Sequence, residues 1–343
     1  MAKSESKIKP LQLALIGGET LLGRELQDVL EKRSDAPVIT GYASTAEGNF
    51  AEQEGEAIYL APLEAKSASG YDAILLAGST PNGALKAYQL AKAAQGHPLL
   101  IDCVGHLEQQ PEARIVSPVN EAHWEKSWLQ TVAHPAAGAL ALVLTKLAAY
   151  AGLKQTIANI FEPASERGKP GISELHQQTT SLLAFKTLEK KVFDSQLSFN
   201  LLPQYGEDAP TKLSTVEQRI EHHLASILNK QEQPALVHMP SLRVVQAPVF
   251  HGYGISLWVE FETSVSADEV RAALKCPEIE VRGEQDEPPD NVGATSQSGL
   301  IAGDIRVDRN NSRAVWIWIV GDNLRLTADA ASEIVDGLKR VSK

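Results

Sequence analysis

A short glycine-rich loop near the start of the chain constrains the fold more than any other feature. The loop Gly17–Gly23 follows the apolar stretch Leu11–Ile16 and opens a segment, ending near Lys32, that carries leucines at helical spacing. In such a strand–turn–helix, glycine is needed where the backbone touches phosphate and where helix and strand pack closely. The loop therefore predicts a dinucleotide-binding unit. The simpler alternative is a turn of the same shape that holds no ligand.

The next hundred residues alternate short apolar runs with amphipathic stretches. We expect strands at Pro37–Tyr42, Ala57–Leu60, Ala73–Ala77 and Pro98–Asp102, and a helix at Pro81–Ala94. Strands that alternate with helices pair in parallel. The pattern therefore predicts an α/β fold with a doubly wound, Rossmann-type sheet.

Beyond residue 136 the expected strands and helices become longer. Helices are expected at Gly138–Tyr150, Ile172–Lys190, Ser214–Leu228 and Ala328–Val341, and strands at Lys154–Ala164, Ala235–Val249, Ile255–Phe261, Ile305–Val307 and Ala314–Val320. Long strands with few crossovers predict an α+β unit with a mixed or antiparallel sheet and helices on one face. The expected domains are residues 1–136, residues 137–322, and a C-terminal helix at 323–343 that packs back on the first domain.

Composition excludes several kinds of partner and site. The 32 Lys and Arg against 43 Asp and Glu give a formal net charge of -11 without a basic stripe, so nucleic-acid binding is not expected. No run of about eighteen apolar residues predicts a membrane span. The apolar stretch behind the basic start is too short for a signal peptide, so we expect a cytoplasmic protein. The two cysteines cannot form a disulfide framework, and the spacing of the nine histidines predicts no metal site.

Several segments, taken in order, resemble the aspartate-semialdehyde dehydrogenases, and in particular their Usg-type relatives that lack the catalytic cysteine. Besides the glycine loop (GATGxVG in the family), the matching segments are Pro118–Asn120 (VPEVN), Ser165–Leu175 (SGAGxxGxxEL), Phe199–Pro203 (FNxxP), Ala247–Gly252 (VPVxxG) and Gly321–Arg325 (ADNLR). The resemblance covers nearly the whole chain. It implies an NAD(P)-binding domain, a dimerisation domain, a homodimer and a role in amino-acid biosynthesis.

The same resemblance shows that the residues needed for the family's reaction are replaced. The family converts aspartyl phosphate and NADPH to the semialdehyde, or the reverse, through a thioacyl intermediate on a cysteine, with a histidine as acid/base. The matching positions hold Ala137 for the cysteine, Glu162 for a glutamine, Gln246 for an arginine and Tyr253 for the histidine. No catalytic position is intact.

Two more positions bear on the binding of an anionic substrate. Glu108 replaces a family arginine, whereas Arg219 corresponds to a lysine that contacts phosphate. If Glu108 and Glu162 line one cleft, they should reject an acyl phosphate, because like charges about 4 Å apart repel by about 4 kcal/mol at an effective dielectric near 20. Arg167 and Lys169 are candidates to neutralise them.

The cofactor site keeps only part of the family pattern. The resemblance assigns cofactor binding to Gly17, Gly18, Thr20, Leu21, Leu22, Gly23 and Ser44. Thr20 stands where a glycine would ease the approach of phosphate. The arginine that meets the 2′-phosphate of NADP is missing, and Glu47 would repel that phosphate, so NAD is favoured over NADP if a dinucleotide binds. Glu166 and Arg167 replace family glycines and could fill the nicotinamide pocket.

The sequence leaves three functions open. The favoured one is a homologue that has lost semialdehyde dehydrogenase activity and keeps the fold and the dimer. The alternatives are an NAD(P)-dependent oxidoreductase acting on an aldehyde or oxo group of another substrate, and an active aspartate-semialdehyde dehydrogenase with a different nucleophile. Cys103 is the thiol nearest the expected site, although a small buried cysteine is its simpler interpretation, as a structural histidine is for His134.

Three tryptophans bear on assembly. Trp258, Trp316 and Trp318 lie on neighbouring expected strands, where they either pack beneath the helices or form an apolar sheet face used by a homodimer. The sequence does not identify a small-molecule or protein partner.

Overall fold

A computed structural model describes residues 9–45, 47–53, 56–117, 119, 127–229 and 237–341. The chain divides into two compact units. The first consists of Met1–Arg114, Trp124–Val132 and Ala328–Lys343, and the second of Ile115–His123 and Ala133–Thr327. Of the motif at Pro118–Asn120, both end residues lie outside the described residues. Among the described helices, none is long and apolar enough to cross a membrane.

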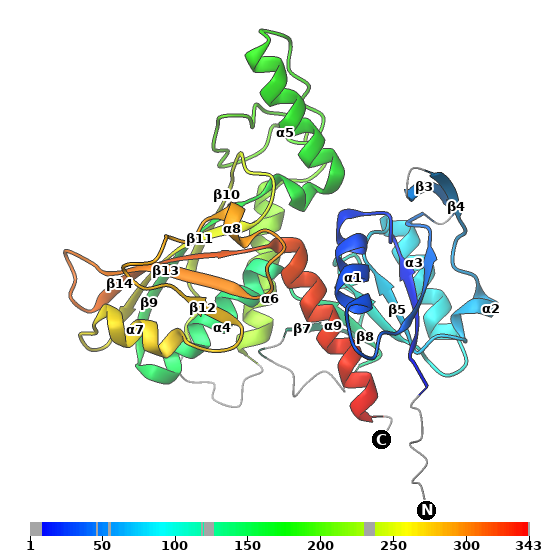
Figure 1. Cartoon of the computed structure of the whole chain (residues 1–343), viewed down its shortest axis with the longest axis horizontal. Helices are drawn as coiled ribbons and strands as arrows, with labels where there is room; N and C mark the ends of the chain where they lie inside the picture. Colours follow the sequence, from blue (N-terminus) through cyan, green and yellow to red (C-terminus); the bar gives the residue numbers. More distant parts are fainter. Residues whose placement is uncertain are drawn as a thin grey trace, which may run out of the picture. The chain divides into compact units, whose positions relative to one another are not determined.

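The first unit is built on a parallel sheet with strand order β2-β1-β5-β6-β8-β7 (Figure 1). Its strands are β1 (Gln12–Ile16), β2 (Val38–Tyr42), β5 (Ala73–Leu76), β6 (Leu99–Asp102), β7 (Ala113–Val116) and β8 (Leu129–Val132), with helices α1 (Leu21–Glu31), α2 (Ala65–Ala68) and α3 (Pro81–Ala93) between them. β1 pairs in parallel with both β2 and β5. The predicted doubly wound sheet is confirmed, and its strand order reverses between β1 and β5.

One expected strand has a different place. Ala57–Leu60 lies in β4 (Glu56–Leu60), which pairs antiparallel with β3 (Asn49–Gln53) in a separate hairpin. The apolar run at Ala57–Leu60 therefore predicted a strand but not the sheet to which it belongs. In β5 and β6, which lie inside the parallel sheet, all four residues are buried. In α3 the buried side chains are mainly alanines, which let that helix pack closely.

The second unit contains a mixed sheet with strand order β10-β9-β11-β14-β13-β12. Its strands are β9 (Leu153–Glu162), β10 (Ser241–Gln246), β11 (Tyr253–Phe261), β12 (Ile279–Val281), β13 (Leu300–Val307) and β14 (Ala314–Gly321). The four central strands are antiparallel, and each edge strand is parallel to its neighbour. Alternate strand residues join one apolar core with α4 (Pro135–Tyr150), α6 (Leu213–Leu228) and α7 (Ala267–Leu274). The predicted mixed sheet with helices on one face is confirmed.

The opposite face of this sheet carries the tryptophans. Trp258 lies beside Trp316 in the register of β11 and β14, and both indole N–H groups donate to Asp308 Oδ2, at 2.9 and 3.0 Å. Trp316 is 39% exposed. The tryptophans therefore do not pack beneath α4, α6 and α7, because their side chains alternate with the core-facing residues of the same strands.

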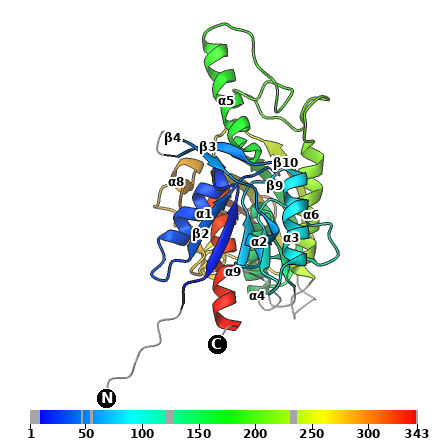
Figure 2. The ribbon, with the colours of Figure 1, turned by 90° about the vertical axis from the view of Figure 1, so that its right-hand side faces the viewer.

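Helix α5 (Gly168–Leu183) projects away from the sheet of the second unit (Figures 1 and 2). It ends at Leu183, not at the predicted Lys190, and Phe185 then takes a positive φ of 53°. Two buried side chains of α5 hold the returning chain: Glu174 accepts from the amides of Val192 and Phe193, and Gln178 accepts from those of Leu197 and Ser198. These bonds give the segment after α5 a fixed path without helical structure.

Other element bounds also differ from the predicted ones. α4 begins at Pro135 instead of Gly138, α9 (Asn323–Val341) begins before the predicted Ala328, and β10 is much shorter than Ala235–Val249. Pro240 and Pro248 flank β10, and proline cannot donate a ladder hydrogen bond. The elements outside the prediction include strands β3, β7, β8 and β12 and helices α2, α7 and the short α8 (Asn291–Ala294).

Candidate functional site

Ala137 lies in the first turn of α4 and is fully buried. His134 caps this helix, and its Nδ1 accepts a hydrogen bond from the amide of Ala136 at 3.3 Å. A cysteine in this position would have its thiolate stabilised by the helix N-terminus. The methyl group of Ala137 instead joins the apolar core of the second unit.

Two polar groups face the other nitrogen of His134. The hydroxyl of Tyr253, the first residue of β11, lies 3.4 Å from His134 Nε2, and a carboxylate oxygen of Glu166 lies 3.9 Å from the same atom. Since Nδ1 accepts the capping bond, the ring proton is assigned to Nε2. Both neighbours therefore meet one nitrogen, and the imidazole cannot pass a proton between them through its two ring nitrogens.

Burial dominates the ionisation of these three groups. It lowers the pKa of His134 well below its ordinary value, and nearby Arg219 adds to the effect. Burial, followed by the charge of Glu166, raises the pKa of the Tyr253 phenol well above its ordinary value. Burial and the charge of Glu162 also raise the pKa of Glu166. Near neutral pH the imidazole and the phenol are thus both uncharged, which removes the imidazolium that acid catalysis would use.

Glu162, the last residue of β9, is held by an ion pair. Its Oε1 lies 2.6 Å from a terminal nitrogen of Arg167 and 3.3 Å from the Tyr205 hydroxyl oxygen. Arg167 thus neutralises Glu162, as one of the two candidates named from the sequence, whereas Lys169 is exposed. Rejection of an anion by Glu108 and Glu162 together stays a prediction, and the charge of Glu162 in it is compensated by Arg167. In the described part of the chain, Glu162 Oε2 and Arg167 Nε are buried without a hydrogen-bond partner.

Gln246 has no amide group left for a ligand. Its Nε2 donates to the backbone oxygens of Glu162 and Ala247, at 2.8 and 3.1 Å, and its Oε1 accepts from the Tyr205 hydroxyl at 2.6 Å. The side chain is fully buried. Gln246 therefore fastens the ends of β9 and β10 and does not replace the anion-binding arginine of the family pattern.

Asn323 explains why three separated motifs lie together. Its Oδ1 accepts from the Ser165 hydroxyl and the Gly252 amide, at 3.0 and 3.2 Å, and its Nδ2 donates to Glu166 Oε1 at 2.9 Å. We call the side chains of His134, Glu162, Glu166, Arg167, Tyr205, Gln246, Tyr253 and Asn323 the buried network. Asn323 stood in a recognised motif, but Tyr205 had no signal in the sequence and was missed.

The glycine loop of the first unit is fixed by close backbone contacts. Gly17 has a φ of +82°, and a Cβ there would lie 2.1 Å from the backbone oxygen of Gly78. A Cβ on Gly23 would lie 2.1 Å from the backbone oxygen of Gly17. At Gly18 the nearest described atom would be 3.4 Å away, so glycine is not required there. The loop thus needs two of its glycines for packing alone, whether or not it holds a ligand.

Thr20 occupies the space beside this loop. Its hydroxyl caps α1 by accepting from the Gly23 amide at 3.0 Å, and it also lies 2.8 Å from the oxygen of Gly17. Its methyl group packs so closely on Gly78 that a Cβ at Gly78 would lie 2.2 Å away. The Thr20 side chain is therefore held between the glycine loop and Gly78.

The remaining predicted cofactor residues lie around the same loop. Leu21 and Leu22 form the first turn of α1 and are partly exposed, and the Ser44 hydroxyl, just after β2, accepts from Asn49 at 3.2 Å. Glu47 is exposed. Glu19, whose Oε1 accepts a hydrogen bond from Asn49 Nδ2 at 2.8 Å, was not among the residues predicted from the sequence.

Three other predicted residues have distinct outcomes. Arg219 lies on α6, and its charge acts on both His134 and Glu166, so it belongs with the buried network. Glu108 lies in a turn of the first unit, whereas Glu162 is in the second, and a shared cleft stays a prediction. Cys103 is buried, and burial raises the pKa of its thiol far above the ordinary value, which confirms the simpler interpretation of an unreactive cysteine.

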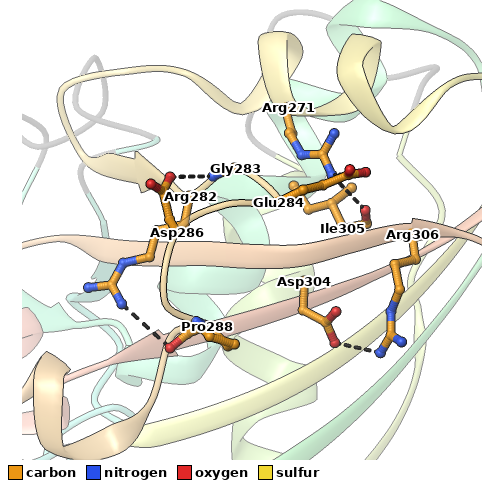
Figure 3. A pocket seen from close by; sticks show the side chains of 9 residues that line it. All are labelled: Arg271, Arg282, Gly283, Glu284, Asp286, Pro288, Asp304, Ile305 and Arg306. Carbon is orange, nitrogen blue, oxygen red and sulfur yellow. Dashed lines mark hydrogen bonds and ion pairs between the residues drawn. The ribbon is translucent and has the colours of Figure 1, made fainter.

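A separate pocket of about 190 Å³ lies in the second unit, where α7, β13 and the loop after β12 meet (Figure 3). Its arginines already have partners: Arg271 pairs with Asp268 and Glu284, Arg282 with Glu280, and Arg306 with Asp304. The charges in this pocket are therefore balanced. Among the described residues, no group of three or more His, Cys, Asp or Glu side chains is arranged to hold a metal ion.

Comparison with known proteins agrees with this architecture. The family model "Semialdehyde dehydrogenase, dimerisation domain" matches residues 144–326. The chain is 28% identical over 323 residues to the USG-1 protein homolog of Azotobacter vinelandii, which covers 92% of this chain and 93% of that protein.

Two solved structures share the fold. A probable aspartate-semialdehyde dehydrogenase from Pseudomonas aeruginosa is 26% identical, with a TM-score of 0.81 over 96% of this chain and 98% of that one. Aspartate semialdehyde dehydrogenase II from Vibrio cholerae, in complex with ASA, is 23% identical, with a TM-score of 0.82 over 97% of this chain and 99% of that one.

Proposed function

Because the chain belongs to the semialdehyde dehydrogenase family, whose dimerisation-domain model matches more than half of it, we propose that it is a dimeric homologue without semialdehyde dehydrogenase activity. The observation that carries this proposal is the fully buried methyl group of Ala137 at the position of the family's nucleophile. The reaction needs a thiolate that attacks an acyl group and later leaves. Neither step has an atom to perform it at this position.

The buried network supports the same conclusion. In an active site, polar groups point at the reacting atoms and change partners during the reaction. Here the side-chain amides of Gln246 and Asn323 are hydrogen-bonded to other protein atoms, and Arg167 is paired with Glu162. A substrate carboxylate or phosphate would have to displace these buried bonds before it could bind.

An assay of phosphate-dependent semialdehyde oxidation tests the loss of activity. The purified full chain is incubated with aspartate semialdehyde, phosphate and NAD or NADP, and formation of NADH or NADPH is followed at 340 nm. An active family enzyme and a heat-killed sample are the controls. We expect no rate above that of the heat-killed sample, and phosphate-dependent turnover would overturn the proposal.

A cysteine at position 137 gives a sharper test. We expect that Ala137→Cys alone does not restore turnover, because Gln246 and Tyr253 also lack the charge and the acid/base group of the family pattern. Thermal melting and titration with a thiol reagent show whether the variant is folded and whether its thiol is accessible, with Ala137→Ser as the matched control. Measurable turnover from this one change would show that the remodelled surroundings matter less than we infer.

Dimerisation is the property most directly supported by the second unit. The half-exposed sheet face of Trp258, Trp316 and Trp318 offers a broad apolar surface, and such aromatic surfaces are enriched in interfaces. Sedimentation of the full chain and of Trp316→Lys tests this assignment, with Val292→Lys, an exposed residue of α8, as the control. A dimer that is weakened only by the tryptophan change supports the face, and an unchanged dimer locates the interface elsewhere.

We further propose that the first unit keeps a weakened dinucleotide site that favours NAD over NADP. The packing glycines preserve the turn, whereas Thr20 narrows it. Calorimetric titration of the full chain with each dinucleotide is the test, and the absence of heat with both would remove this part of the proposal. We also propose domain boundaries at residues 136 and 322. Packing of the C-terminal helix on the first domain is supported by the hydrogen bond from Arg33 to the Ser332 hydroxyl. Cell fractionation and the growth requirements of a deletion strain test a cytoplasmic place in amino-acid biosynthesis.

A further inference from the structure

A carboxylate in the glycine loop has no part in the function proposed so far. Glu19 Oε1 accepts a hydrogen bond from Asn49 Nδ2 at 2.8 Å. The same Asn49 nitrogen donates to the Ser44 hydroxyl at 3.2 Å, which places Ser44 beside this carboxylate. Burial alone would raise the pKa of Glu19, but the polar groups of Ser44, Asn49 and the local backbone together lower this pKa below its ordinary value. Glu19 is therefore held as a carboxylate in a set of donors that suits an anion.

The position of this carboxylate, in the loop after β1, indicates what it could bind. The loops after β1, β2 and β5 converge around it: the Thr20 hydroxyl lies 3.1 Å from the oxygen of Ala77, and the Thr80 amide donates to the oxygen of Ser44 at 3.1 Å. These loops follow the carboxyl ends of three neighbouring parallel strands, and the strand order reverses between β1 and β5. In doubly wound sheets, ligands bind at that switch point.

The role of the Glu19 carboxylate follows from how dinucleotide-binding sheets recognise the adenosine ribose. In dinucleotide-binding sheets, a carboxylate near the end of the second strand accepts a hydrogen bond from the 2′-hydroxyl of the adenosine ribose and disfavours a 2′-phosphate. Here the residue after β2 that faces the loop is Ser44, and it carries a hydroxyl that itself binds Glu19. Glu47, the carboxylate nearest to that position along the chain, is exposed. The carboxylate at the end of β2 is thus supplied by the loop after β1.

We propose that Glu19 is the residue that reads the 2′ position of a bound adenine dinucleotide, accepting a free 2′-hydroxyl and rejecting a 2′-phosphate. This rests on the proposed retention of dinucleotide binding by the first unit. The ligand class is an adenine dinucleotide, or a fragment of one, that has no 2′-phosphate. Repulsion between the carboxylate and a phosphate a few ångströms away corresponds to a preference of about 10- to 100-fold, because partial exposure screens the charges.

The experiment compares two charge-matched variants of the full chain. Dissociation constants for NAD and NADP are measured by calorimetry on the wild type, Glu19→Gln and Glu47→Gln, each of which must show a cooperative thermal transition. Glu19→Gln removes the charge and keeps an oxygen that can accept from Asn49. Glu19→Ser provides a second, smaller replacement if the glutamine variant is unstable.

The expected result is a wild type that binds NAD about 10-fold or more tighter than NADP. Glu19→Gln should strengthen NADP binding by about the same factor. Glu47→Gln, which tests the rival carboxylate named from the sequence, should change the ratio of the two constants less, and a larger change in Glu47→Gln than in Glu19→Gln would overturn the inference. If both dinucleotides bind and Glu19→Gln does not change their ratio, the inference is overturned and retained binding stands. If neither dinucleotide binds to the wild type or to the Glu19 variants, retained binding fails and the inference fails with it.

Discussion

The glycine loop of the first unit and the buried network of the second have both departed from the family pattern, but in different ways. In the loop, the backbone shape is retained, and Gly17 and Gly23 are still required by contacts under 2.5 Å that any Cβ would make with neighbouring backbone atoms. In the buried network, the backbone positions are retained while the side chains have changed, and the new side chains bind one another.

Under the proposed loss of activity, this difference indicates which features persist after a reaction is lost. A glycine that packs against another strand is needed for folding, so it persists when its ligand is no longer essential. A catalytic side chain is not needed for folding in this way. It can be replaced by any group whose polar atoms form hydrogen bonds within the protein. Retained glycines are therefore weaker evidence for a retained ligand than retained catalytic side chains are for a retained reaction.

The largest expected effect comes from breaking the Glu162–Arg167 ion pair. Arg167→Ala leaves the carboxylate of Glu162, which is 0% exposed, without a charge partner. Removing one member of a buried pair destabilises a protein by about 3–5 kcal/mol. Urea denaturation measures the change, and the double variant Glu162→Gln/Arg167→Met should recover most of it. A loss below about 1 kcal/mol in Arg167→Ala would mean that the network is hydrated and open, and the contrast with the loop would then disappear.

The second test addresses the loop. Gly23→Ala places a methyl group 2.1 Å from the backbone oxygen of Gly17, so the loop or the start of α1 must shift. We expect a loss of roughly 1–3 kcal/mol in the free energy of unfolding, which is typical of overpacking. Gly18→Ala is the matched control, because its nearest neighbour would be 3.4 Å away. Equal stability of the two variants would contradict the view that packing preserves this loop.

The sequence could predict the elements whose signals are local. Alternating strands and helices identified the parallel sheet, and the positions of Ala137 and Tyr253 identified the altered site, because each lies in a recognisable segment. The end of α5 could not be predicted in the same way, since it depends on bonds from Glu174 and Gln178 to backbone amides about twenty residues further along the chain.

The residue that neutralises Glu162 could not be predicted from the sequence either. Arg167 and Lys169 were both predicted as candidates to neutralise Glu162, but which of them does so depends on the direction in which each side chain leaves the start of α5. Tyr205, which binds both Glu162 and Gln246, lies about forty residues from each. Such contacts between distant segments are decided by tertiary packing, and periodicity carries no information about them.

The smallest expected effect separates a buried neutral histidine from a titrating one. Because the pKa of His134 is lowered in the folded state, its contribution to stability is present above the unfolded pKa near 6.5 and is lost as the pH falls below it. His134→Asn keeps an N-cap acceptor for α4 but does not titrate, so between pH 7.5 and 5.5 it should lose about 1 kcal/mol less stability than the wild type. Urea denaturation at the two pH values measures this difference, and His176→Asn, an exposed position on α5, should behave like the wild type. A wild type and a His134→Asn variant with the same pH dependence would mean that His134 has the same pKa in the folded and unfolded protein, and that the buried network retains a solvated imidazole able to take part in proton transfer.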